Sequence, residues 1–147
     1  MRKIRFVTLF TLAMALSCIV GYSTMVYAYG NVTDTQYMYH NAGAATMNTS
    51  GRAKLDATKV YIHPTSGPEL KYTVQGYDNS HTPSTWENRS STHQVSTGVK
   101  ASFTNFVYEN GNPTARLHME KTQSVSIYTV GVWSPDSTRN YTIYKWS

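Results

Sequence analysis

Residues 58–75 read TKVYIHPTSGPELKYTVQ, and this stretch decides the fold class of the chain. Apolar and polar residues alternate on both sides of the segment 64–68 (PTSGP), which is rich in proline and glycine. One face would carry Val60, Ile62, Leu70, Tyr72 and Val74, and the other Lys59, Tyr61, His63, Lys71, Thr73 and Gln75. A period of two is typical of β-strands, and the proline–glycine segment is typical of a turn. The stretch therefore predicts a strand, a turn and a second strand.

The same alternation recurs along the chain, and no stretch after residue 28 has the 3.6-residue spacing of an amphipathic helix. Further strands are expected at 35–40, within 95–108, and at 115–120, 124–133 and 141–146. Turns are expected at 109–113 (ENGNP) and 134–137 (SPDS), and a long polar loop at 78–92. This layout fits a sandwich or a barrel. We predict an all-β, antiparallel β-sandwich of about seven to eight short strands.

The first 28 residues have the pattern of an export signal. Arg2, Lys3 and Arg5 precede the apolar run 6–20, and Val26-Tyr27-Ala28 offers the small residues of a signal-peptidase site. We expect a helical signal peptide at 1–28, cleaved after Ala28, and a single secreted domain at 29–147.

Two alternatives use the same residues. Ala15-Leu16-Ser17-Cys18 resembles a lipobox, in which Cys18 would be lipidated, and residues 6–28 are long enough to remain as an uncleaved anchor. All three interpretations place the domain outside the cytoplasm, either secreted or anchored on the extracellular side. The membrane would then be contacted only through this segment.

The charge of the expected mature chain argues against nucleic-acid binding. Residues 29–147 carry ten Lys and Arg against eight Asp and Glu, because three of the thirteen basic residues lie in the signal. Nucleic-acid-binding domains instead concentrate basic residues on one face. The single cysteine, Cys18, also lies in the signal, so the mature domain must fold without a disulfide.

No motif for catalysis, metal binding or a cofactor stands out, and we expect none of the three. Glu109, Arg116, His118 and Glu120 are close in sequence and offer the base, cation and acid of a small ribonuclease-like hydrolase. We interpret them, and the five histidines, as polar residues facing solvent opposite an apolar core.

Aromatic residues are the stronger indication of a binding role. Tyr and Trp combine a flat apolar face with a polar edge, which suits contacts with sugars or partner proteins. Trp133 is expected in the core, whereas Trp86 in the polar loop and Tyr144 and Trp146 near the end are candidate contact residues. The expected partner is a cell-wall polymer or precursor, or another surface protein.

The sequence resembles two groups of proteins, one through its C-terminal third and one through its layout as a whole. Gly131-Val132-Trp133, a polar turn and the aromatic ending 141–146 (YTIYKW) resemble the end of the lactococcin 972-type bacteriocins. That resemblance implies an exported, cysteine-free β-sandwich that acts on cell-wall synthesis. The layout as a whole, including Lys59-Val60-Tyr61 and 131–136 (GVWSPD), is similar to uncharacterised small secreted proteins of Gram-positive bacteria.

These observations favour a non-enzymatic binding or interaction protein of a bacterial envelope. A bacteriocin-like antagonist of cell-wall synthesis is the first alternative, and a small secreted ribonuclease-like hydrolase is the second.

Overall fold

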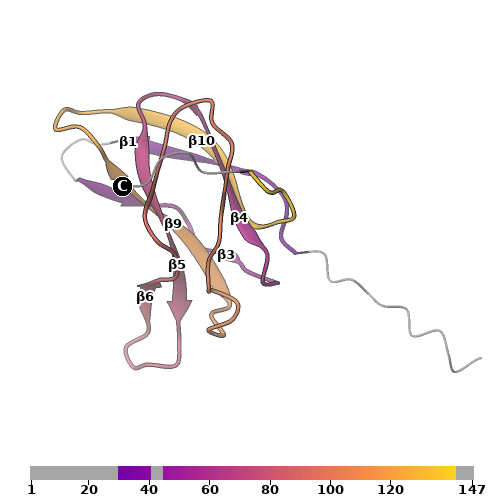
Figure 1. The fold of residues 1–147 in the computed structure, drawn as a ribbon. Coiled ribbons are helices and arrows are strands. Elements are labelled where there is room, and N and C mark those ends of the chain that lie inside the picture. The colour runs from indigo at the N-terminus through magenta and orange to yellow at the C-terminus, as the bar shows by residue number, and fades with distance from the viewer. Residues whose placement is uncertain (1–29, 41–44, 142–147) are drawn as a thin grey trace, which may run out of the picture.

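The computed structural model describes residues 30–40 and 45–141, which form ten antiparallel strands in two sheets (Figure 1). The strands are β1 (Thr35–His40), β2 (Thr46–Asn48), β3 (Arg52–Ala53), β4 (Lys59–Ser66), β5 (Leu70–Asp78), β6 (Thr85–Asn88), β7 (His93–Val95), β8 (Ala101–Phe103), β9 (Thr114–Lys121) and β10 (Tyr128–Ser137). The predicted all-β antiparallel fold is confirmed. It has more strands than expected because five of those described contain four residues or fewer.

Each sheet has a simple order. Sheet A runs β1-β10-β4-β8, and sheet B runs β2-β9-β5-β6, with β3 also paired to β9 and β7 to β5. β10 therefore lies between two partners, as expected for a strand that is apolar on both faces. The hairpin of β5 and β6 extends beyond the rest of the sandwich (Figure 1).

The core lies between the two sheets and contains the apolar faces that the alternation predicts. Val60 and Ile62 of β4 and Leu70, Tyr72 and Val74 of β5 are all fully buried. On β9 the buried residues are Ala115, Leu117 and Met119. Trp133 is 1% exposed, so its expected place in the core is confirmed.

The predicted turn 64–68 is only partly a turn, because residues 64–66 are the end of β4, and the chain after them connects the two sheets rather than two neighbouring strands. β4 pairs with β10 and β8, whereas β5 pairs with β6, β7 and β9, so the chain crosses from sheet A to sheet B after Ser66. Gly67 makes this possible because its φ is +93° and because a Cβ there would collide with the carbonyl oxygen of Tyr128.

Two loop predictions were wrong. The expected loop 78–92 contains β6, which pairs with β5 and places Trp86 directly opposite Tyr77. The expected turn 134–137 is the end of β10, which continues to Ser137 through a bulge after Ser134. Asp136 ties this end to other segments, because its carboxylate accepts hydrogen bonds from Asn31 N and Leu55 N.

Three residues expected on polar faces are buried instead: Tyr61, Thr73 and His93. Tyr61 is only 4% exposed because the Arg139 guanidinium lies 4.2 Å from its ring and the Tyr141 ring 5.8 Å away. His93 is buried beside Phe103, with ring centroids 4.6 Å apart, and burial lowers its pKa. It is therefore not one of the solvent-facing histidines that the sequence predicts.

Two further predictions fall outside the described residues. They are the signal peptide at 1–28, with its alternatives at Cys18 and 6–28, and the strand at 141–146 beyond Tyr141. Among the residues that are described, no helix is long and apolar enough to cross a membrane.

The stability of the sandwich is expected to fall as the pH rises above 10.0, the ordinary pKa of tyrosine. Tyr37 and Tyr72 share a buried hydrogen bond of 2.8 Å between their hydroxyl oxygens, and burial raises the pKa of both phenols. Above 10.0 the unfolded state loses protons that the folded state keeps, so the free energy of unfolding decreases with pH.

Urea-unfolding midpoints between about pH 8 and about pH 11 would measure this decline. Tyr37→Phe is expected to make it shallower, because one of the two titrating groups is removed. A midpoint that stays constant over this range would contradict the prediction.

Candidate binding groove

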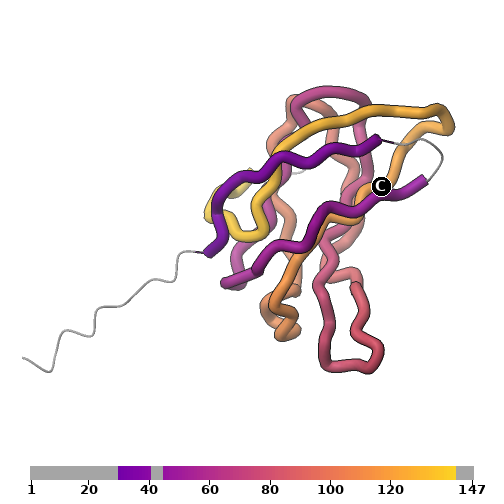
Figure 2. Tube along the Cα trace, turned by 180° about the vertical axis from the view of Figure 1, so that it is seen from behind, coloured from indigo at the N-terminus to yellow at the C-terminus, as the bar shows by residue number. Residues whose placement is uncertain are grey.

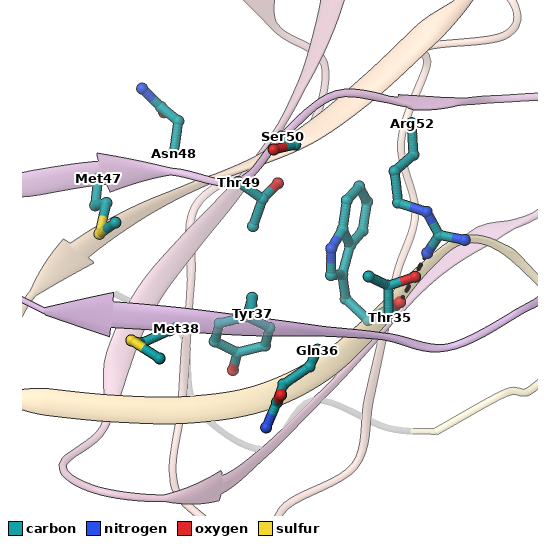
Figure 3. A pocket seen from close by; sticks show the side chains of 10 residues that line it. Thr35, Gln36, Tyr37, Met38, Met47, Asn48, Thr49, Ser50 and Arg52 are labelled. Atoms are coloured by element: carbon teal, nitrogen blue, oxygen red, sulfur yellow. Dashed lines mark hydrogen bonds between the residues drawn. The ribbon is translucent and has the colours of Figure 1, made fainter.

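A groove of about 400 Å³ lies where the edge of sheet A meets the edge of sheet B. β1 and β2 run side by side along it (Figure 2), and the two strands belong to different sheets. Figure 3 shows Met47 and Thr49 pointing from the β2 side toward β1. The groove is therefore an opening between the two layers of the sandwich.

The floor of the groove is aromatic. Trp133 of β10 and Tyr37 of β1 line it, and both are almost fully buried in the core. The Tyr37 hydroxyl is engaged with Tyr72, so this tyrosine offers the groove no free hydrogen-bonding group, and only a small part of the two aromatic side chains reaches the groove. Such a floor suits apolar side chains or flat rings.

Arg52 closes one end of the groove. Its Nη1 donates to the backbone oxygen of Trp133 (3.1 Å) and its Nη2 to Asn31 Oδ1 (2.8 Å). The guanidinium carbon also lies 5.4 Å from the centre of the Trp133 ring. Burial lowers the pKa of Arg52, and the nearby carboxylates of Asp34 and Asp136 oppose that shift.

The rim carries two methionines that are unusually open to solvent. Met38 of β1 is 51% exposed and Met47 of β2 is 39% exposed. Methionine side chains adapt to varied apolar partners, and exposed ones are frequent at binding surfaces. At the end of the groove away from Arg52, the Tyr39 hydroxyl donates a hydrogen bond to the backbone oxygen of Ala45. This bond links β1 to the start of β2.

Both strands beside the groove are sheet edges. Within the described ranges β1 pairs only with β10, and β2 pairs only with β9. The outer backbone groups of an edge strand are available to another extended chain. The groove therefore offers main-chain donors and acceptors on both sides of an apolar floor.

The groove was not predicted from the sequence, and the structure places the predicted contact residues elsewhere. Trp86 lies on the outer face of sheet B, half-buried, with the Tyr77 ring 5.1 Å away and the Arg116 guanidinium 4.2 Å away. Tyr144 and Trp146 lie outside the described residues. The only sequence indication of the groove was Trp133, which we assigned to the core.

The residues considered for a hydrolase are spread along sheet B. Arg116, His118 and Glu120 follow one another on the outer face of β9, whereas Glu109 lies in the turn before that strand. Arg116 Nε donates to Gln75 Oε1, and His118 Nδ1 lies 2.8 Å from Asn48 Oδ1. Glu109 and Glu120 are therefore at opposite ends of β9.

One group of side chains has the composition of a metal site. Ligand atoms of Asp78, His81 and Glu87 lie within 4.8 Å of one another near the tip of the β5–β6 hairpin. Arg89 Nη2 lies 3.2 Å from Asp78 Oδ2 and 2.8 Å from Glu87 Oε2. Because this guanidinium already forms ion pairs with both carboxylates, we assign no ion to the group.

Comparison with known proteins gives a family and no function. No curated protein and no solved structure matches the chain. The resemblance of 131–146 to the lactococcin 972-type bacteriocins therefore stays a prediction. A family model described as "Protein of unknown function (DUF2712)" matches residues 24–137, a range that contains all ten strands and both sides of the groove. The chain belongs to this DUF2712 family.

Proposed function

We propose that this chain is a non-enzymatic binding protein of a bacterial surface and that it takes an extended peptide segment between β1 and β2. The observation that carries the proposal is the pair of open strand edges on either side of an aromatic floor. The expected export signal at 1–28 supports a location outside the cytoplasm.

An extended peptide matches the groove better than a compact ligand does. A strand that enters between β1 and β2 would hydrogen-bond to both edges and bridge sheet A to sheet B. Its alternate side chains would point inward to Trp133 and Tyr37, since residues of a strand alternate between its two faces. Affinity would come from the main chain, and specificity from the side chains on the floor.

The occupant is best sought among the proteins of the same cell surface. A wall glycan has no main-chain amides with which to complete two sheet edges, so the open edges favour a protein segment. A glycan or wall precursor would instead suit the outer face of sheet B, where Trp86 lies.

Charging the rim of the groove is expected to weaken peptide binding by at least about tenfold. The Met38→Asp/Met47→Asp double variant places two carboxylates where an incoming strand would pack, and both positions are exposed enough to leave the fold intact. Binding would be measured on immobilised, overlapping peptides that cover the surface proteins of the bacterium that makes this chain. Each peptide would be at least as long as the six residues of β1.

Val125→Asp is the matched control, because Val125 is 58% exposed and does not line the groove. It is expected to bind as the unmodified chain does. Purified cell-wall sacculi provide the competing probe. Retention on sacculi that is lost in Trp86→Ala and kept in the rim variant would move the site to sheet B and overturn the groove proposal.

A further inference from the structure

Lys54 and Asp136 form an ion pair that is completely closed to solvent. Lys54 Nζ lies 2.7 Å from Asp136 Oδ1, and both side chains have 0% exposure. The two residues are 82 positions apart, so their contact links the loop before β4 to the end of β10. Buried charges are expensive and are usually paired, as these two are.

The Asp136 carboxylate has two backbone donors on its other oxygen. Oδ2 accepts Asn31 N at 2.6 Å and Leu55 N at 3.0 Å. Burial raises the pKa of Asp136, whereas the hydrogen bonds from Lys54, Leu55 and Asn31 and the charge of Lys54 together lower it, and the net effect is a lowered pKa. Two fixed N–H groups on one oxygen are also the arrangement that stabilises the oxyanion of a tetrahedral intermediate.

A second carboxylate stands beside the lysine. Asp56 Oδ1 lies 3.9 Å from Lys54 Nζ, and the Asp56 side chain is 30% exposed. Thr58 N holds that oxygen at 2.9 Å, while the Thr58 backbone oxygen accepts from Lys54 Nζ at 2.5 Å. Asp56 is therefore held beside the ammonium, and a small approach of the two side chains would bring them within hydrogen-bond distance for proton exchange.

Gly30 packs closely against both Asp56 and Asp136. A Cβ at this position would lie 2.5 Å from Asp136 Cβ and would collide with the Asp56 carboxylate. The close approach of this glycine backbone keeps water away from the pair. Exclusion of water and fixed geometry together replace a bimolecular encounter with an intramolecular one, which gives very high effective concentrations.

We propose that Lys54 Nζ and Asp136 Cγ condense into an isopeptide bond with the release of one water molecule. The charged pair is the resting form, so the reaction begins with an uphill proton transfer from the Lys54 ammonium to Asp136 Oδ1 along their hydrogen bond, which leaves a small population of neutral amine and neutral acid. The Nζ lone pair then attacks Cγ, and the carbonyl electrons move onto Oδ2, where Asn31 N and Leu55 N hold the negative charge.

Asp56 completes the step as the proton carrier. It takes one proton from Nζ and returns it to the Oδ1 hydroxyl, which leaves as water while the Oδ2 carbonyl reforms. Nζ keeps one hydrogen as the amide N–H, and no oxidant, reductant or further reactant is involved. The product is a covalent cross-link in a domain that has no cysteine after residue 18.

The test is the intact mass of the folded full chain, read after peptide mapping has established its N-terminus. The expected mass is lower than the sequence mass by one water molecule, and fragmentation is expected to find a branched peptide that joins Lys54 to Asp136. A folded chain that keeps its full sequence mass after prolonged incubation overturns the proposal. A water loss that maps to any other pair of residues also overturns it.

Three variants sharpen the result. Lys54→Met is expected to restore the full sequence mass, and Lys71→Met, the matched control on the outer face of sheet B, is expected to keep the loss of water. Asp56→Ala retains both bond-forming residues, so a slower loss of water in this variant identifies Asp56 as the proton carrier. Equal rates for Asp56→Ala and the unmodified chain would contradict that role.

Discussion

Asp136→Ala is expected to lower the free energy of unfolding by about 3–5 kcal/mol, because it leaves Lys54 as a buried charge without its partner. The substitution also removes the acceptor for Asn31 N and Leu55 N. If the isopeptide bond forms, the loss is larger, since a link between residues 82 positions apart restricts the unfolded chain.

Urea unfolding of Asp136→Ala, Lys54→Met and the double variant Lys54→Met/Asp136→Ala would measure this effect as a double-mutant cycle. The double variant is expected to be more stable than the sum of the two single losses predicts, because it leaves no unpaired charge. Losses for both single variants below about 1 kcal/mol would show that the pair is not important for stability.

Trp133→Ala is expected to destabilise the domain by about 3–5 kcal/mol, the usual range for removing a large buried aromatic side chain. Trp133 is 1% exposed, lies on the central strand β10 and supports the guanidinium of Arg52. Its loss would leave a cavity in the core and would remove the floor of the groove.

Tyr128→Ala on the same strand is the matched control, since Tyr128 is 49% exposed, and a change within about 1 kcal/mol is expected. Thermal and urea unfolding would compare the two variants. A similar small loss in both would mean that Trp133 does not belong to the packed core.

The sequence predicted the strands whose two faces meet different environments. In β4, β5 and β9 one face is buried against the other sheet, so apolar and polar residues alternate and the period of two is clear. Short strands such as β2 have no such signature, because all three of its residues are exposed.

Long-range contacts explain the wrong prediction at 134–137. Ser134-Pro135-Asp136-Ser137 has the composition of a turn, yet Asp136 is held by Asn31 and Leu55, which are 105 and 81 positions away. Local composition contains no information about such partners. The loop 78–92 was misread because its residues are mostly polar, although β6 pairs with β5 in a hairpin and Trp86 packs against Tyr77 and against Arg116, which is more distant in the sequence.

The candidate groove could not be predicted because it depends on how the sheets are ordered. Met38 and Met47 belong to different strands, and only the assignment of β1 and β2 to different sheets brings them to one opening. Trp133 was identified as a core residue, but no local pattern indicates that one part of a core residue lines a groove.

The junction of Asn31, Lys54 and Asp136 also decides how the domain would respond to a mechanical pull. A force applied between residues 31 and 136 acts first on this junction, because Asn31 N is bonded directly to the Asp136 carboxylate. Lys54 ties the same carboxylate to the loop before β4. Tension between residues 31 and 136 would thus act on a few polar contacts at this junction. Most of the two sheets would carry no load until the junction breaks.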